Sequence, residues 1–195
     1  MAGRDLPALR EAAWAVLAKT VRATADARDA ESALALLTAA VRELLGDKEA
    51  HLRPGALKVG ERQFSVSGVF LIEPDGGHHL LVAEHGFPPE QHRLRVPIDV
   101  GHPGRVVARQ QPLLLANTDD DPGFRQILKT ARMGSALYGP MFWSGRMLGQ
   151  LVTASQARHT YGAPDLEILI AFAHVAAAVY VAHGGPEFLR VASGS

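Results

Sequence analysis

The chain has 195 residues, enough for one domain with a substantial core and too few for two domains of ordinary size. Hydrophobic residues make up 47% and charged residues 21%, and 20 Lys and Arg balance 20 Asp and Glu, which disfavours disorder, nucleic-acid binding and attraction to an anionic membrane. The absence of cysteine excludes disulfides, thiolate metal sites and thiol nucleophiles, and it fits the cytoplasm, where we expect this protein.

The amino-terminal segment predicts two amphipathic helices. Charged residues are mixed with the apolar residues at the start of the chain, which excludes the apolar core of a signal peptide. Apolar residues recur at helical spacing from Leu6 to Val21 and again from Leu34 to Leu45. The second stripe follows Asp29, a plausible N-cap, and stops before Gly46, so both of its ends carry helix signals.

The centre of the chain holds short apolar runs of strand character. The predicted strands are 66–73, 79–85, 94–98, 113–116, 136–143 and 148–154. Pro74-Asp75-Gly76-Gly77 predicts a hairpin between the first two, and Ser144-Gly145 predicts one between the last two. A short helix that opens with proline is predicted over 103–110. These elements indicate an α+β fold around one antiparallel sheet.

The last predicted helix, 164–183, carries two apolar stripes where a helix packed on one sheet needs one. The second stripe must be covered by another helix, either of this chain or of a second subunit. We favour a homodimer, with intrachain packing as the alternative. The predicted interface residues are Ile168, Phe172, Val175 and Val179. The longest apolar run, 168–182, falls short of the ~20 residues of a membrane span, so we expect no membrane.

Several segments between about Val66 and His183 follow a family pattern in order. They are Val96-Pro97-Ile98 with Gly104-Arg105-Val106, Tyr138-Gly139-Pro140-Met141 with Gly149-Gln150-Leu151, and the helical run from Asp165 to Ala178. In these segments the chain resembles the GAF family of sensory domains. The resemblance implies a profilin- and PAS-like six-stranded antiparallel sheet, with the N- and C-terminal helices packed on one face and a ligand pocket under loops on the other.

The residue pattern and the resemblance together imply a domain organisation. We expect signalling or dimerisation helices over 1–46, a loop or irregular insertion over 47–65, a GAF-like core over 66–184 and a flexible tail over 185–195. Members of the family bind cyclic nucleotides, tetrapyrroles, haem, small anions, amino acids or metal ions, and commonly dimerise through terminal helices.

Two groups of residues are candidates for ligand binding. His102 and Arg105 flank the start of the short helix, where unsatisfied backbone N–H groups favour an anion, although the glycines there can equally serve only to turn the chain. The resemblance places the loop from Asn117 to Arg125 where family ligands are capped. It adds Asn117, Asp119, Phe124 and Arg125 as ligand candidates, with a solvated acidic turn as the alternative, and Tyr138 offers a hydroxyl on an apolar ring.

The cofactors of the family are mostly disfavoured. Thr118 replaces a lysine of the cyclic-nucleotide pattern, and Leu128-Lys129 stands where its acidic pair would follow. Covalent bilin attachment and the reduction of free methionine sulfoxide both need cysteine, which the chain lacks. Haem needs only one histidine ligand and therefore stays as an alternative.

The histidines do not predict a metal site. His79 and His85 share strand parity but lie ~20 Å apart at the rise of an extended strand. His174 and His183 lie ~13 Å apart along a helix. Both separations exceed what one ion can bridge, so we predict no metal.

The sequence lacks the common catalytic motifs. It contains no Gly-x-Ser-x-Gly elbow, no phosphate-binding loop with its lysine and no His-Glu-x-x-His pair, so we expect no enzyme. The favoured function is a sensory or regulatory module that binds a polar or anionic small molecule, forms a homodimer and acts on a separate effector protein. The alternatives are a ligand-free dimerisation scaffold with a degenerate pocket, and a haem- or metal-binding gas or redox sensor.

Overall fold

A six-stranded antiparallel sheet forms the centre of the computed structural model, which describes residues 6–121 and 133–194. The strands are β1 (Ser65–Ile72), β2 (His78–His85), β3 (Arg95–Pro97), β4 (Leu113–Leu115), β5 (Ser135–Trp143) and β6 (Arg146–Ser155). Their order across the sheet is β3-β2-β1-β6-β5-β4, so both predicted hairpins are present and join through β1 and β6. The predicted α+β class is confirmed.

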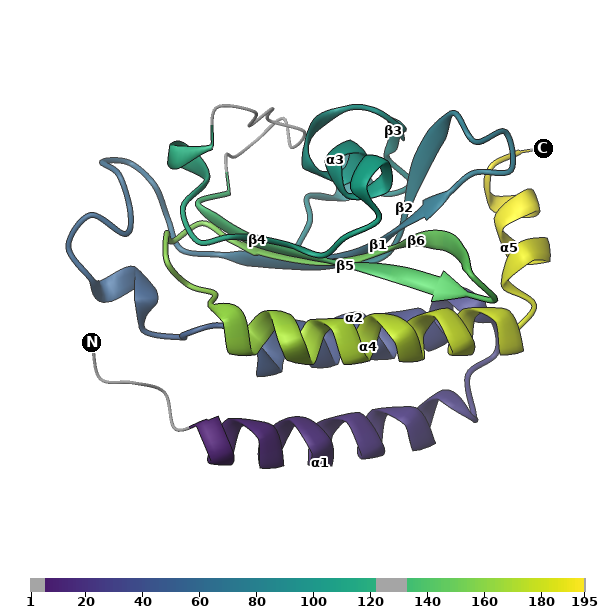
Figure 1. Ribbon diagram of the computed structural model, residues 1–195, viewed down its shortest axis with the longest axis horizontal. Helices are drawn as coiled ribbons and strands as arrows, with labels where there is room; N and C mark the ends of the chain where they lie inside the picture. Colours follow the sequence, from purple (N-terminus) through teal and green to yellow (C-terminus); the bar gives the residue numbers. More distant parts are fainter. Residues whose placement is uncertain (1–5, 122–132, 195) are drawn as a thin grey trace.

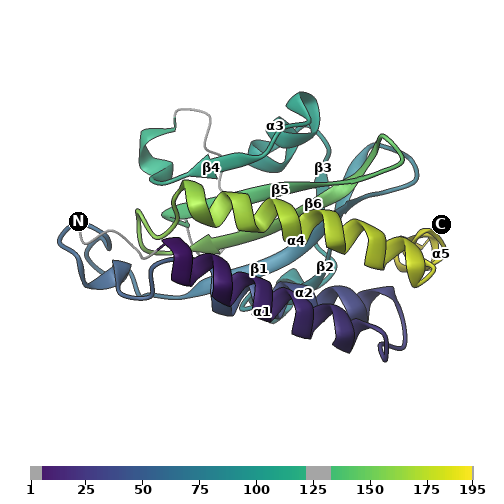
Figure 2. The same ribbon diagram turned by 60° about the horizontal axis from the view of Figure 1, so that its bottom comes forward.

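The helices lie on both faces of this sheet. They are α1 (Leu6–Thr24), α2 (Ala30–Leu44), α3 (Gly101–Arg109), α4 (Ala163–Ala182) and α5 (Gly185–Ala192), with short 3-10 turns η1 (Ala50–Leu52), η2 (Pro89–Gln91) and η3 (Thr118–Asp120). Figure 1 shows α2 and α4 side by side under one face, α1 outside them, and α3 on the opposite face. Figure 2 shows α1 running along this helix pair. We call the two sides of the sheet the helix-pair face and the α3 face.

The helix-pair face is filled by apolar side chains. The main core cluster includes Leu34 and Leu37 of α2, Leu151 of β6, and Leu169 and Phe172 of α4, all with no exposed surface. Such close packing removes apolar area from water and supplies most of the stability of a domain of this kind. The space for a guest must therefore be sought on the α3 face.

The ends of α2 and α4 are fixed by carboxylates. Asp29 caps α2 by accepting a hydrogen bond of 2.7 Å from the backbone N–H of Ser32, as its sequence position predicts. The buried carboxylate of Asp165 accepts from the N–H of Gly46 at 2.9 Å and from that of Gly162 at 3.0 Å. One side chain thus joins the end of α2 to the start of α4.

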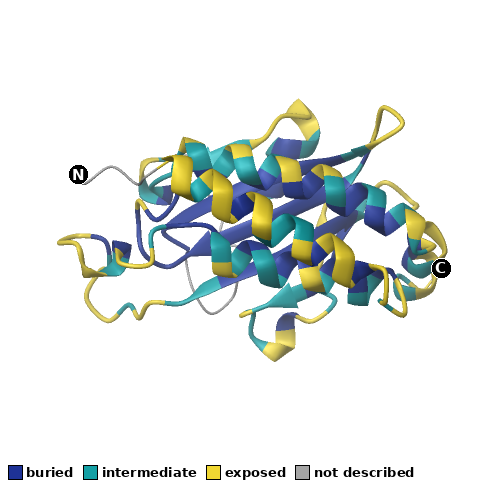
Figure 3. Cartoon of the chain, turned by 90° about the horizontal axis from the view of Figure 1, so that it is seen from below, coloured by how far each residue is buried: buried dark blue, intermediate teal, exposed yellow. Residues whose placement is uncertain are grey.

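The second apolar stripe of α4 packs against α1 and α2 of the same chain. Phe172 is 0% exposed and Val179 is 8% exposed, whereas Ile168 and Val175 are partly exposed. A side chain without exposed surface in the single chain has none to bury against a second copy. Phe172 therefore belongs to the core and leaves the predicted interface. Exposed positions run along the outer side of α1, as Figure 3 shows.

Among the described helices, α4 is long and apolar enough to cross a membrane by length and composition alone. The prediction that this segment is too short for a membrane span was wrong. It measured the apolar run from Ile168, whereas the helix begins at Ala163 and has 20 residues. The core helix of a soluble protein passes the same test. The position of α4 between the sheet and α1 is that of a core helix (Figure 1).

The prediction of a flexible tail is wrong for residues 185–192, which form α5. Gly184 adopts a left-handed conformation with φ of 69°, which separates α5 from α4. The new helix contacts both α2 and α4, and the guanidinium of Arg93 lies 5.2 Å above the ring centroid of Phe188. These contacts explain why a segment with little sequence signal is ordered.

Candidate functional site

The α3 face carries a second apolar cluster that encloses a small cavity. Its volume is ≈50 Å³, and it is lined by Val66, Phe70, Phe87, Pro103, Met133, Tyr138, Val152 and Ala154. These residues come from β1, β5, β6 and α3 and from two loops. Because a water molecule occupies about 30 Å³ of liquid, a cavity of this size accommodates a small apolar group in its present form. It lies on the face where the sequence predicts the ligand.

Three charged or polar side chains gather beside this cavity. The Nη1 of Arg105 donates to Oδ2 of Asp121 at 2.7 Å, and the Nε2 of His102 lies 3.6 Å from the same oxygen. The rings of His102 and Tyr138 are 6.0 Å apart between centroids, and Tyr138 also lines the cavity. The structure therefore brings together three of the predicted ligand residues, His102, Arg105 and Tyr138.

Asp121 is the part of this group that sequence reasoning missed. It is the last residue of the acidic run Asp119-Asp120-Asp121, for which the sequence left a solvated turn as the alternative, yet its side chain is only 12% exposed. An acidic run of three gives no sign of which member faces inward. The fold determines which acidic residue faces inward, because η3 ends at Asp120 and the carboxylate of the next residue then reaches Arg105.

Asn117 and Asp119 have other partners. Asn117 caps η3 by accepting from the N–H of Asp119 at 3.1 Å. The Asp119 carboxylate pairs with Lys58 at 2.8 Å and with Arg158 at 2.9 Å, and its hydrogen bond to Lys58 is the main cause that lowers its pKa. Neither residue joins the group around Arg105. Their role as ligand contacts stays a prediction, and Phe124 and Arg125 lie outside the described residues.

A buried arginine fastens the 47–65 segment to the loop that carries η3. Arg158 is 3% exposed, donates to Asp119, and donates through Nη2 to Glu61 at 3.1 Å. Its Nη1 also donates to the carbonyl of Ala56 at 3.3 Å. The hydrogen bond to Glu61 is the main cause that raises the pKa of Arg158. Sequence reasoning gave Arg158 no role because a single arginine in a loop has no periodic signal.

A fully buried polar pair, His79 and Gln150, lies on the α3 face next to the cavity. The Nε2 of Gln150 donates to the carbonyl of Pro103 at 3.1 Å and lies 3.1 Å from the Nε2 of His79. The second amide hydrogen therefore points to the imidazole, whose Nε2 accepts and whose proton sits on Nδ1. The pair joins β2 and β6 to the first turn of α3.

The predicted parity of His79 and His85 is wrong because β2 contains a bulge. The pairing with β1 shifts between Ser67 and Val69, and Ala83 has a positive φ of 52°. As a result His79 faces α3, whereas the Nε2 of His85 contacts the carbonyl of Ala35 on α2 at 2.9 Å. An irregularity of one residue is not visible in an apolar run.

Burial of His79 predicts a pH-dependent stability. Desolvation lowers the pKa of His79 from 6.5 to about 4, so between these values the unfolded chain binds a proton that the folded chain does not. The stabilising effect is complete above pH 6.5 and is lost as the pH falls toward 4, by up to about 3 kcal/mol. Urea unfolding at pH 7 and pH 4.5 measures this change in the free energy of unfolding.

Two variants separate the effect of His79 from that of the other groups that titrate in this range. His79→Phe should reduce the pH dependence, whereas His51→Gln, at a half-buried residue whose ring contacts the carbonyl of Lys48, should leave it unchanged. An identical pH dependence in wild type and His79→Phe would contradict the assignment.

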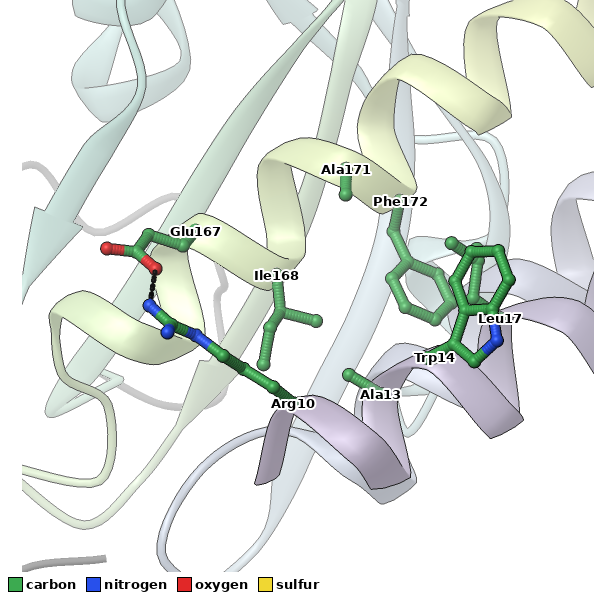
Figure 4. Close-up of a pocket in the computed structure, with 8 residues that line it drawn as sticks. All are labelled: Arg10, Ala13, Trp14, Leu17, Glu167, Ile168, Ala171 and Phe172. Carbon is green, nitrogen blue, oxygen red and sulfur yellow. Dashed lines mark hydrogen bonds and ion pairs between the residues drawn. The ribbon is translucent and has the colours of Figure 1, made fainter. Parts of the chain in front are cut away.

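A separate groove lies on the far side, between α1 and α4. Its volume is ≈220 Å³, and it is lined by Arg10, Ala13, Trp14, Leu17, Glu167, Ile168, Ala171 and Phe172 (Figure 4). Trp14 is 71% exposed, and the Nη2 of Arg10 donates to Glu167 at 3.2 Å at one end of the groove. The groove is therefore an apolar surface with a charged end.

One group of side chains in residues 6–121 and 133–194 has the spacing of metal ligands. Glu73, Asp75 and His78 place one ligand atom each within 4.8 Å of one another at the β1–β2 turn. Arg95 donates to both carboxylate oxygens of Glu73 at 3.0 Å, so a cation of this chain already neutralises the most buried ligand. The group works as an ion pair that joins β3 to the hairpin.

Comparisons with known proteins agree on the fold. The GAF domain from a phosphoenolpyruvate-protein phosphotransferase of Coxiella burnetii matches with a TM-score of 0.72 and 22% identity, over 90% of this chain and 96% of that chain. The free methionine-R-sulfoxide reductase from Neisseria meningitidis, in complex with its substrate, matches with a TM-score of 0.70 and 21% identity, over 94% and 95%. The fRMsr of Staphylococcus aureus matches with 0.64 and 17%, over 86% and 94%. No curated protein matches the sequence.

These neighbours correct the expectation that the chain is no enzyme. That expectation rested on the absence of common catalytic motifs and of cysteine, yet several of the similar structures are named as reductases. The fold therefore gives no ground for excluding catalysis. The identities of 14–21% to these reductases show a common fold, and this chain contains no cysteine.

The sequence itself matches a family model. The model describes the GAF domain and covers residues 55–179, more than half of the chain and all six strands of the sheet. The family is generally one of small-molecule-binding regulatory or sensory modules. The resemblance seen in the sequence motifs is thus confirmed, and the chain belongs to the GAF family.

Proposed function

We propose that this protein is a regulatory module that binds a small polar or anionic molecule on the α3 face of its sheet. The observation that carries the proposal is the group of Arg105, Asp121 and His102, in which the His102 ring lies 6.0 Å from that of Tyr138, a residue that lines the apolar cavity of ≈50 Å³. A guanidinium next to apolar walls binds an anion more strongly than it does in water, because the surroundings screen the charge less. Action on a separate effector protein and a cytoplasmic location stay predictions.

Two alternatives make different use of the same cavity. The small volume of the cavity supports a ligand-free scaffold, because the side chains of the apolar cluster on the α3 face leave little space for a ligand. A haem sensor has less support, because a porphyrin is many times larger than a cavity of ≈50 Å³. Of the two buried histidines of this face, His79 contacts Gln150 through its Nε2, and the Nε2 of His102 lies 3.6 Å from Asp121.

Thermal unfolding with a panel of metabolites separates the sensor from the scaffold. A ligand that binds only the folded state raises the melting temperature by mass action, and we expect such a rise for at least one anionic metabolite. Arg105→Gln should abolish the rise. Arg109→Gln is the matched control, because Arg109 lies one turn further along α3 and is exposed. Flat melting curves across the panel would favour the scaffold.

We also propose that the protein is a homodimer that associates through the groove between α1 and α4. Trp14 protrudes beside an apolar groove on the same surface, so a twofold axis would let each tryptophan enter the groove of the other copy. Trp14 thereby replaces Phe172 among the predicted interface residues, while Ile168 remains.

Sedimentation tests the dimer. We expect a dimer at tens of micromolar and a monomer for Ala171→Glu, which places a charge on an exposed residue of the groove. Leu52→Glu is the control, because Leu52 is also an exposed apolar residue but lies on η1, outside the groove. A monomeric wild type at this concentration would exclude the proposed dimer.

A further inference from the structure

The group beside the cavity already holds a carboxylate. Asp121 places one oxygen 2.7 Å from Nη1 of Arg105 and 3.6 Å from Nε2 of His102, and its side chain is 88% removed from water. These are the contacts that a free carboxylate of a ligand would make. We call the position of this oxygen the carboxylate seat. The chain's own Asp121 shows that a carboxylate fits there.

Arg105 keeps further capacity for an anion. Its Nε is buried and has no hydrogen-bond partner, and Asp121 uses only Nη1. A buried donor of a charged group left without a partner costs free energy, and a carboxylate bound in a fork arrangement would satisfy it. The single hydrogen bond to Asp121 is therefore weaker than the paired hydrogen bonds that the guanidinium could form with a carboxylate.

His102 links the carboxylate seat to the apolar cavity. His102 is followed by Pro103, which lines the cavity, and its ring contacts Tyr138, which also lines it. At about 30 Å³ per water-sized group, a volume of ≈50 Å³ corresponds to about two methylene or methyl groups. We expect an anion at the seat to extend an aliphatic chain of this length toward the cavity.

We propose that the ligand of this site is a short aliphatic monocarboxylate, whose carboxylate replaces that of Asp121 on Arg105 and His102 while its chain enters the cavity. This inference rests on the proposed function and names its ligand class. Asp121 acts as a built-in competitor, because a carboxylate tethered in the same chain has a high effective concentration. The free ligand must displace it.

The surroundings favour a carboxylate over a phosphate. Within residues 6–121 and 133–194, one guanidinium and one imidazole lie within 4 Å of the Asp121 carboxylate, and Lys58 and Arg158 are paired with Asp119. A phosphate carries more charge and more acceptor oxygens than these donors can satisfy, and an apolar cavity leaves the remainder unpaired. A single carboxylate matches these described donors.

Melting temperatures of wild type, Asp121→Ala and the double variant Asp121→Ala, Arg105→Gln test the proposal. The probes are sodium acetate, propionate and butyrate, with sodium chloride, sodium phosphate and propionamide as controls. We expect propionate and butyrate to raise the melting temperature of Asp121→Ala saturably, by about 5 °C or more, and acetate to raise it less. Wild type should need at least about tenfold higher concentrations, because it retains the competitor.

The double variant should not respond, since it lacks the guanidinium. An equal response of both variants, an equal effect of chloride or propionamide, or a stronger effect of phosphate would overturn the proposal. Should Asp121→Ala fail to fold, Asp121→Asn keeps the shape of the side chain and removes the competing charge, and it should again bind propionate more tightly than wild type. Equal binding to wild type and Asp121→Asn would overturn the proposal as well.

The proposed function fails separately from this inference. A wild-type protein stabilised through Arg105 by an anion other than a monocarboxylate would overturn the ligand class and support the regulatory module. Absence of any wild-type response to the metabolite panel, together with no rescue of Asp121→Ala, would overturn both.

Discussion

Replacing Phe172 by alanine is expected to lower the free energy of unfolding by about 3–5 kcal/mol. Phe172 is the largest fully buried side chain of the chain as described, and it packs in the cluster formed by α2, α4 and the sheet. Removing its ring leaves a cavity that the surrounding leucines cannot fill, because they belong to three different elements. Urea unfolding followed by circular dichroism measures the loss.

Trp14→Ala is the matched control for this prediction. Both aromatic side chains line the groove between α1 and α4, but Trp14 is 71% exposed and Phe172 is 0% exposed. We expect Trp14→Ala to change the free energy of unfolding of the single chain little and to weaken the dimer. A small stability loss for Phe172→Ala together with dissociation would return Phe172 to the interface and would show that α1 does not cover it in solution.

Replacing Arg158 by alanine should cost about 3–5 kcal/mol of stability. The guanidinium is 3% exposed and binds Glu61, Asp119 and the carbonyl of Ala56. Its removal leaves two partly buried carboxylates without their common partner. Because the same side chain joins the 47–65 segment to η3, we also expect faster proteolysis within that segment than in wild type.

Arg190→Ala supplies the control for a salt bridge on the surface. Arg190 pairs with Glu187 on α5, and both side chains are more than half exposed, so its loss should cost about 0–1 kcal/mol. A double-mutant cycle of Arg158→Ala with Glu61→Gln then isolates the coupling between the buried partners. Equal losses for Arg158→Ala and Arg190→Ala would contradict the structural role given to Arg158.

The order of elements could be predicted from the sequence because each has a local signal. The stripe after Asp29 and the Pro74–Gly77 and Ser144-Gly145 turns repeat rules that operate within a few residues. The bulge at Ala83 and the helix over 185–192 could not be predicted. Both depend on contacts between residues far apart in the chain, such as that of Arg93 with Phe188.

The candidate site was predictable only in part. His102 and Arg105 were chosen because a helix start has defined electrostatics, and the structure brings both next to Asp121, while their role as ligand contacts stays a prediction. Asn117 and Asp119 were chosen from their position in the loop. In the structure Asn117 caps η3 and Asp119 forms a salt bridge with Arg158. Asp121 and Gln150 act through partners about 16 and 47 residues away, which a local pattern does not register.

The two outermost strands, β3 and β4, have three residues each. A long unpaired edge strand is a template for amyloid growth and for the addition of a peptide strand. Edge strands as short as β3 and β4 offer at most about two free backbone hydrogen bonds. Pro97 in β3 contributes no N–H at all. We therefore expect concentrated solutions to resist fibril formation, and an effector to dock on helices or loops instead of extending the sheet.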